Sequence, residues 1–242
     1  MQKKIVVHMY LKNGKAVTGF DGKELLEDGD VMSIAQHYSN NGADELLIFD
    51  LSDDDADHEQ SLNLIRQISR VIDIPMSGGG HIKNLEDVKK LLYAGCQQVF
   101  LNYAKAANIE LTEEVSKRFG KEKIAICTDS FAQLQANKAR VNEYTSRVIL
   151  LCDEVDVRTT ARLVEVPVLP VSTRADRHGL LKLLMLDNIC GVCGDTFSDL
   201  NEDLMAAKLE AKKHGVEINT FESKMSWKIG RASCRERVFG YV

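Results

Sequence analysis

Residues 74–102 read IPMSGGGHIKNLEDVKKLLYAGCQQVFLN, and this stretch decides the fold. A short apolar run ends on three glycines, and a helical pattern over Leu85–Tyr93 follows it. Ala94-Gly95 is a typical helix C-cap, and a second apolar run, Gln98–Leu101, comes directly after it. A strand, a helix and a second strand joined by short connections predict one βα unit of a parallel sheet.

The same order of elements continues in both directions along the chain. Strands are expected over residues 5–9, 45–51, 98–101, 123–128, 147–152, 166–171 and 189–193, and one that opens at 74–76. Helices are expected over residues 31–41, 61–71, 85–93, 112–119, 132–143, 159–164, 179–186 and 200–214. Asn13-Gly14 marks a tight turn after the first strand. Eight such units in 242 residues predict a single closed (β/α)8 TIM barrel over residues 1–222.

The two halves of the chain also resemble each other. Lys4-Ile5-Val6-Val7 is echoed by Lys123-Ile124-Ala125-Ile126. Leu47-Ile48-Phe49-Asp50 is echoed by Leu150-Leu151-Cys152-Asp153. Two half-barrels of four units each would produce such a repeat, and chance similarity between βα units is the alternative.

Composition excludes several classes of protein. The net charge is -5, with no basic stripe of the kind that nucleic-acid binders carry, so no nucleic-acid partner is expected. No apolar run reaches the roughly 18 residues needed to span a membrane. The first residues lead directly into a strand, without the apolar core of a signal peptide, which predicts a cytoplasmic protein.

The cysteines indicate neither a metal nor a redox cofactor. Three of the six, Cys96, Cys127 and Cys152, lie in or beside apolar runs and are expected to be small buried hydrophobic residues. Cys190 and Cys193 form a lone C-x-x-C without the second pair that a zinc site requires. We therefore expect no metal and no cofactor.

The glycine-rich strand end and its helix resemble the third βα unit of the HisA/HisF family of histidine biosynthesis. Val99-Phe100-Leu101-Asn102 resembles the fourth strand of that family. Gly42-Ala43-Asp44-Glu45-Leu46 and Phe49-Asp50-Leu51-Ser52 resemble the second unit. The resemblance is strong through Asp129 and weaker from there to about residue 220. It implies a phosphate-binding barrel of the ribulose-phosphate type and a phosphorylated small molecule as ligand.

The resemblance implies two phosphate sites of unequal quality. Gly79, Gly80 and Asn102 match the first site, where glycines let backbone N–H groups approach an anion closely. The second site should follow the seventh strand, where this chain has Ser172, Thr173 and Arg174 in place of a glycine-rich sequence. We expect the second site to be weak.

The implied catalytic pair is incomplete. The family's cyclase uses an aspartate at the end of strand one and another at the end of strand five as general acid and base. The strand-five residue is present as Asp129, but Tyr10 stands at the strand-one position. A tyrosine, with a pKa near 10, is a poor replacement for a carboxylate base.

Other polar residues are expected near the same rim. Asp50 ends the second strand. His81 follows the glycines and could be a general acid, a phosphate ligand or a plug that fills an abandoned site. The acidic run Asp53–Asp57 could hold a cation, but a solvated loop is the simpler expectation.

These departures favour a catalytically degenerate barrel. The chain resembles the HisF-like domain at the N-terminus of bifunctional phosphoribosyl-AMP cyclohydrolase/phosphoribosyl-ATP pyrophosphohydrolase (HisIE) proteins, and a covalently linked cyclohydrolase domain would be its partner. Residues 223–228 are expected to begin the linker to that domain. Residues 229–242 are basic, lack apolar periodicity and resemble a translated sequencing adapter, so a non-native tail is expected. The alternatives are an active cyclase or isomerase and a phosphosugar-binding sensor.

Overall fold

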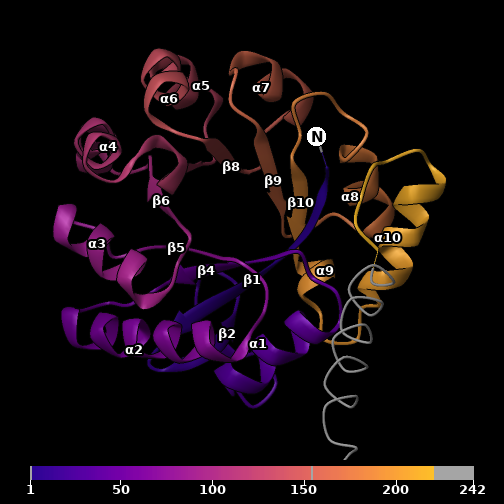
Figure 1. Ribbon diagram of the computed structural model, residues 1–242, viewed down its shortest axis with the longest axis horizontal. Coiled ribbons are helices and arrows are strands. Elements are labelled where there is room, and N and C mark those ends of the chain that lie inside the picture. The colour runs from indigo at the N-terminus through magenta and orange to yellow at the C-terminus, as the bar shows by residue number, and fades with distance from the viewer. Residues whose placement is uncertain (1, 154, 221–242) are drawn as a thin grey trace, which may run out of the picture.

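Eight parallel strands close into a ring in the computed structural model, which describes residues 2–153 and 155–220 (Figure 1). The strands are β1 (Lys4–Lys12), β4 (Glu45–Asp50), β5 (Met76–Gly79), β6 (Gln98–Asn102), β7 (Ile124–Thr128), β8 (Arg147–Leu151), β9 (Val168–Ser172) and β10 (Gly191–Gly194). Each strand pairs with the next along the chain, and β10 pairs with β1 to close the ring. The predicted TIM barrel is confirmed.

Helices surround this ring and cover its outer face (Figure 1). They are α1 (Val31–Asn40), α2 (Asp55–Val71), α3 (Leu85–Ala94), α4 (Ala106–Phe119), α5 (Phe131–Ala136), α6 (Lys138–Tyr144), α7 (Val157–Leu163), α8 (Arg177–Leu183), α9 (Asp195–Ser198) and α10 (Leu204–Lys213), with a 3-10 turn, η1, at Lys121–Lys123. Helix α3 begins with a capping box formed by Asn84 and Asp87, and it ends at Gly95 with φ 115°. The predicted glycine cap is therefore confirmed.

Two expectations about helices were wrong. The acidic run is not a solvated loop, because the Asp54 carboxylate accepts a hydrogen bond from the Asp57 N–H at 2.8 Å and starts α2 at Asp55. The helix expected over residues 132–143 is two helices that meet at Asn137. The Asn137 side chain donates to the Gln133 carbonyl at 2.9 Å, which is the kind of local bond that favours helix ends.

A hairpin extends β1 beyond the barrel. Asn13 and Gly14 have φ values of 49° and 69° and turn the chain into β2 (Lys15–Thr18), as predicted. Strand β2 also pairs with the short β3 (Glu24–Leu25). The loop between β2 and β3 contains Phe20, whose ring contacts the barrel side chains Tyr10 and Phe49.

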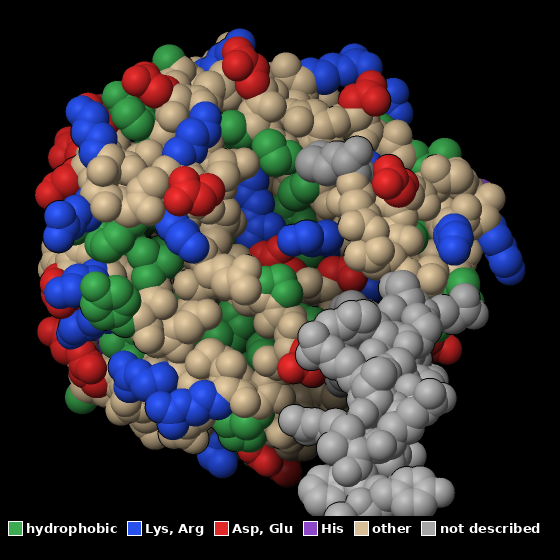
Figure 2. Space-filling model, viewed as in Figure 1, with side chains coloured by type: hydrophobic (Ala, Val, Ile, Leu, Met, Phe, Trp, Pro, Cys, Tyr) green, Lys and Arg blue, Asp and Glu red, His purple; other side chains and the backbone are tan. Residues whose placement is uncertain are grey.

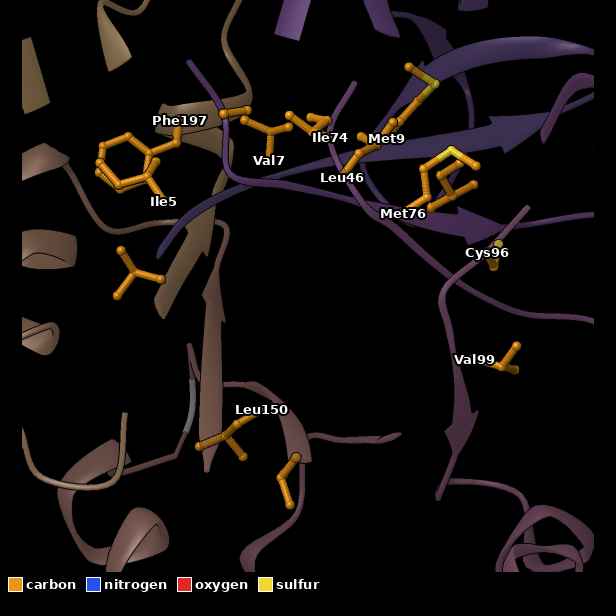
Figure 3. Packing of buried hydrophobic residues seen from close by; sticks show 14 of the residues in the cluster. Ile5, Val7, Met9, Leu46, Ile74, Met76, Cys96, Val99, Leu150 and Phe197 are labelled. Atoms are coloured by element: carbon orange, nitrogen blue, oxygen red, sulfur yellow. The ribbon is translucent and has the colours of Figure 1, made fainter. Parts of the chain in front are cut away.

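Apolar side chains pack in two separate cores because successive residues of a strand point to opposite faces. The outer core lies between strands and helices and includes Ile5, Val7 and Leu46 (Figure 3). The inner core lies within the ring and includes Val6 and Leu47. Alternation along β1 and β4 therefore divides neighbouring residues between the two cores.

A charged network closes the end of the barrel where the strands begin. The Arg147 guanidinium forms a two-point ion pair with Glu45, with Nη1 3.1 Å from Oε2, and also donates to Ser77 Oγ at 2.9 Å and Gln98 Oε1 at 2.5 Å. Lys4 Nζ lies 3.0 Å from Glu45. Burial raises the pKa of Glu45, but Arg147 outweighs it and holds that pKa at about 2. Figure 2 shows charged side chains of both signs in the hollow at the centre of the ring.

The two ends of the described chain meet at this floor of the barrel. Lys3 forms a parallel bridge with Ile218, and the Lys3 N–H donates to the Glu217 carbonyl at 2.8 Å. The segment after α10 therefore runs beside the start of β1. This contact ties the last described residues to the first strand.

We expect Gly79→Ala to destabilise the barrel by about 1–3 kcal/mol, because a Cβ there would overpack the inner core. It would lie 2.3 Å from the Phe100 ring and 2.6 Å from the Phe100 carbonyl oxygen. Urea unfolding measures the change. Gly78→Ala is the matched control, since its nearest neighbour is the Cys96 sulfur at 2.8 Å and this side chain can shift. Equal losses for the two variants would show that Phe100 does not press on Gly79.

Candidate functional site

The predicted site residues lie where the strands end, at the mouth of the barrel. Asp50, Gly79 and Asn102 are the last residues of β4, β5 and β6, and Asp129 directly follows β7. The carboxyl ends of the strands are where barrel enzymes build their sites. The chain therefore carries the expected residues at the expected rim, and their surroundings decide what they can do.

An aromatic cluster fills the mouth beside β1. We call Tyr10, Phe20, Phe49 and Phe100 the aromatic plug. The ring centres of Tyr10 and Phe20 are 4.7 Å apart, those of Phe20 and Phe49 5.2 Å, and those of Phe49 and Phe100 5.0 Å. Contacts at these spacings are those of packed aromatic rings. The plug therefore occupies space that a substrate would need.

Tyr10 cannot act as a general base within this plug. It is 2% exposed, and its hydroxyl has no hydrogen-bond partner among the described residues. Burial raises the pKa of Tyr10 far above its ordinary value, and the nearby Asp195 charge raises it further. The phenol stays protonated at neutral pH.

Asp129 differs from this buried tyrosine in its surroundings. It is exposed, and it makes no hydrogen bond or ion pair with another residue of the described ranges. It lines a hollow of about 500 Å³ together with Phe131, Val155 and Thr159. An exposed carboxylate and a buried phenol do not form an acid–base pair around one reacting atom.

The first predicted phosphate site is partly covered. Gly79 lies against the Phe100 ring, and Gly80, with φ 111°, packs against the Asp50 carbonyl. Close packing is therefore sufficient to require glycine at both positions. The Asn102 side-chain oxygen accepts from the Ala104 N–H at 2.9 Å, so it already closes a local turn.

A carboxylate occupies the second predicted phosphate site. Asp153 accepts hydrogen bonds from Ser172 Oγ at 2.5 Å and from the Thr173 N–H at 3.0 Å, and it also accepts from the Thr173 hydroxyl. Burial raises the pKa of Asp153, but these hydrogen bonds outweigh it and the net shift is downward. The exposed Arg174 uses its backbone N–H to donate to Ser172 Oγ at 3.2 Å. The donors that would hold a phosphate are bonded to Asp153 instead.

His81 lies at a corner between β5 and α2. Its φ is 54°, its Nε2 is 2.7 Å from Asp55 Oδ1, and its ring stacks on His58 with centres 4.7 Å apart. The hydrogen bonds from His81 and Lys83 lower the pKa of the Asp55 carboxyl to about 2. The aromatic plug, rather than His81, fills the mouth.

Asp50 also bonds within this corner. Its Oδ2 lies 2.5 Å from His58 Nδ1, and its Oδ1 accepts hydrogen bonds from the Ser52 N–H and hydroxyl. Asp50 is 5% exposed, so its carboxylate is turned toward α2 and away from solvent. Its role here is to join the end of β4 to the start of α2.

Sequence reasoning missed a histidine–carboxylate pair at the mouth. His8 Nε2 lies 3.1 Å from Asp195 Oδ1, and His8 Nδ1 lies 3.2 Å from Ser198 Oγ and 3.4 Å from Cys193 Sγ. The sequence contained a signal for this pair, because His8 precedes Tyr10 by two positions and therefore lies on the same face of β1. Asp195 directly follows β10 and places a further negative charge where the strands end. The pair lines a hollow of about 260 Å³.

The cysteines of the described ranges behave as apolar residues that are buried or half-buried. Burial raises the pKa of Cys96, Cys127 and Cys152 to about 12, so they remain thiols. Cys190 and Cys193 are likewise free thiols. Within residues 2–153 and 155–220, no group of three His, Cys, Asp or Glu side chains is arranged to hold a metal ion. No helix of those ranges is long and apolar enough to cross a membrane.

We expect Asp153→Ala to create phosphate binding at the end of β9, because it frees the Ser172 hydroxyl and the Thr173 amide and removes a negative charge. Amide shifts of Thr173 and Arg174 in a phosphate titration measure it by NMR. Unaltered protein should show weak shifts at Gly80 and none at Thr173. The control is Asp129→Asn, which removes one charge at the mouth without freeing these donors. Equal Thr173 shifts in both variants would mean that charge alone had blocked the site.

The strands and helices define a (β/α)8 barrel, and comparison with known proteins gives its family. The family model described as "Histidine biosynthesis protein" matches residues 4–187, so this chain belongs to that family. It is a barrel of histidine biosynthesis.

The curated relatives are subunits of one enzyme. The chain is 33% identical over 130 residues to imidazole glycerol phosphate synthase subunit HisF of Flavobacterium psychrophilum, covering 54% of this chain and 52% of that protein. The HisF subunit of Haemophilus influenzae is 32% identical over 162 residues, covering 66% and 60%. That of Helicobacter hepaticus is 34% identical over 132 residues, covering 53% and 51%. The chain spans about half the length of the curated relatives it matches.

Proposed function

We propose that this chain is a histidine-biosynthesis barrel without cyclase activity. The observation that carries the proposal is the aromatic plug, which buries Tyr10 at the position where the family's cyclase needs a carboxylate. A protonated phenol under packed rings neither accepts a proton nor admits a substrate. Asp129 then lacks the carboxylate partner that the family's cyclase uses for general acid–base catalysis.

The phosphate sites support the same proposal. The cyclase substrates of this family carry a phosphate at each end. Here Phe100 covers Gly79, and Asp153 holds the donors of Ser172 and Thr173. Both anchors that would position such a substrate are therefore weakened or occupied, and positioning contributes much of the rate in enzymes.

We further propose that the barrel is an accessory domain of a phosphoribosyl-AMP cyclohydrolase/phosphoribosyl-ATP pyrophosphohydrolase protein. The aromatic plug fills the mouth, and the hydrogen-bonded ion pair of Glu45 and Arg147 holds the floor together. These features suit a domain that contributes stability or solubility rather than catalytic turnover. The test compares the full-length protein with a version that lacks residues 1–222. Loss of soluble yield or of cyclohydrolase activity on deletion supports the proposal. Unchanged yield and activity would contradict it.

An active cyclase is the second candidate, and the likeness to HisF subunits favours it. Asp129 remains at the rim, and His8 with Asp195 could supply a second acid–base group. Ammonium-dependent turnover of the cyclase substrate separates the two candidates, with the Haemophilus influenzae HisF subunit as positive control. Turnover by this chain would favour the cyclase, and its absence would favour the accessory domain.

A further inference from the structure

The outer wall of the barrel carries a basic hollow between α7 and α8. These helices are neighbours in the outer ring (Figure 1). The basic hollow has a volume of about 360 Å³, and its lining is Arg158, Arg162, Lys182, Met185, Leu186 and Asp187. Three cations and one carboxylate surround it, although the whole chain has a net charge of -5. Its charge is therefore opposite to that of the protein as a whole.

The cations of the basic hollow form no close ion pair in the described part of the chain, although Asp187 lines the same hollow and Asp156 acts on Arg158 at longer range. No salt bridge joins Arg158, Arg162 or Lys182 to a described carboxylate. The nearby Asp156 caps α7, and it accepts from the N–H groups of Arg158 and Thr159 at 3.3 and 3.2 Å. Its hydrogen bonds are therefore used at the start of α7, and it forms no salt bridge with Arg158.

The positions of the two arginines destabilise helix α7. Arg158 and Arg162 are four residues apart on α7 and so lie on one face of that helix. Like charges at this spacing destabilise a helix. The helix dipole favours Arg162 and Lys182, which lie in the last turns of α7 and α8, but Arg158 lies in the first turn of α7, where a cation is unfavourable. A bound anion would offset both effects.

We propose that the basic hollow binds a phosphate monoester that carries an apolar ring, such as a nucleoside monophosphate. Two guanidinium groups and an ammonium group match a phosphate, because guanidinium groups form paired hydrogen bonds to phosphate oxygens. Met185, which is 61% exposed, and Leu186 provide an apolar surface for the ring. A hollow of about 360 Å³ is of the size that small-molecule sites have. The site is separate from the mouth and does not depend on the function proposed for the barrel.

Titration of the whole chain with AMP, inorganic phosphate and adenosine, followed by NMR amide shifts, tests the proposal. AMP should shift the amides of residues 158–162 and 182–186, phosphate should shift the same amides at higher concentration, and adenosine should bind at least about tenfold more weakly than AMP because it lacks the charge. Arg162→Gln should weaken AMP binding about tenfold. Lys212→Gln, an exposed change of equal charge on α10, should leave it unchanged.

Several outcomes would contradict the proposal that the basic hollow binds a phosphate monoester. These are the absence of shifts at α7 and α8, equal binding of AMP and adenosine, or equal weakening by Arg162→Gln and Lys212→Gln. Binding of an oligoglutamate peptide but not of AMP would also overturn it and would assign the hollow to an acidic protein partner. If Arg162→Gln melts at a lower temperature than the unaltered chain, Lys182→Gln replaces it under the same criteria.

Discussion

Glu45→Gln is expected to cost the barrel about 3–5 kcal/mol of unfolding free energy, because it leaves the buried Arg147 guanidinium without its counter-charge. Arg147 is 8% exposed, and Glu45 is its only ion-pair partner among the described residues. The guanidinium also links Ser77 and Gln98, so four strands are joined through one side chain. Urea unfolding, analysed by linear extrapolation, measures the loss.

The matched control removes both charges together. Glu45→Leu combined with Arg147→Met should recover most of the loss, since an apolar pair of similar volume often replaces a buried ion pair at little cost. Ser77→Ala removes one hydrogen bond and should cost about 1 kcal/mol. A Glu45→Gln variant as stable as the unaltered chain would mean that water already solvates Arg147.

The same ion pair makes the unfolding free energy of the barrel decrease at acid pH. The pKa of Glu45 is about 2 in the folded chain, below its ordinary value of 4.5 in an unfolded chain, so its contribution is fully present above about pH 4.5. That contribution is lost as the pH falls from about 4.5 toward 2. In the variant that combines Glu45→Leu with Arg147→Met, the unfolding free energy should depend less on pH over this range.

Tyr10→Asp is expected to leave the barrel without ammonium-dependent cyclase activity, as is the unaltered chain. One positioned acid or base contributes about 10²–10⁴-fold to a rate, so a carboxylate alone restores at most that factor. Phe100 would still cover Gly79, and Asp153 would still hold the donors of Ser172 and Thr173. Turnover of the cyclase substrate with saturating ammonium measures the activity.

Two further proteins make this experiment decisive. Asp129→Asn removes the remaining family carboxylate, and a HisF subunit shows that the assay works. If the unaltered chain turns over and Asp129→Asn abolishes turnover, the barrel is an enzyme and the proposed function is wrong. Far-ultraviolet circular dichroism must show that Tyr10→Asp is folded, because the change places a carboxylate among aromatic rings.

The rim of the barrel could be predicted from the sequence because strand ends are local features. The glycines at 78–80 and Asn102 each follow an apolar run, and parallel strands place their carboxyl ends at one edge. Tyr10 could be recognised as a departure only through the family resemblance, which places an aspartate at this position of the first strand. Periodicity and turn chemistry were sufficient to place these residues at strand ends, and the family resemblance supplied the roles expected of them.

The contacts that fill the mouth and tie the floor together could not be predicted, because they depend on how separate segments of the chain meet in the folded barrel. Asp153 and Thr173 lie on successive loops, and nothing in either loop alone shows that one donates to the other. Phe20 reaches the plug from a hairpin whose path depends on β3. The pairing of Glu45 with Arg147 spans 102 residues across the ring. Each contact is a consequence of barrel closure rather than of local pattern.

The bridge between Lys3 and Ile218 has a consequence for evolution. Because the described chain enters the barrel and leaves it at neighbouring points of the floor, its two ends lie close together. A module whose ends lie close together can be inserted into other chains or circularly permuted with little change in its own contacts. Selection on such a module acts through its folding and its solubility, which is compatible with a mouth that has filled with side chains.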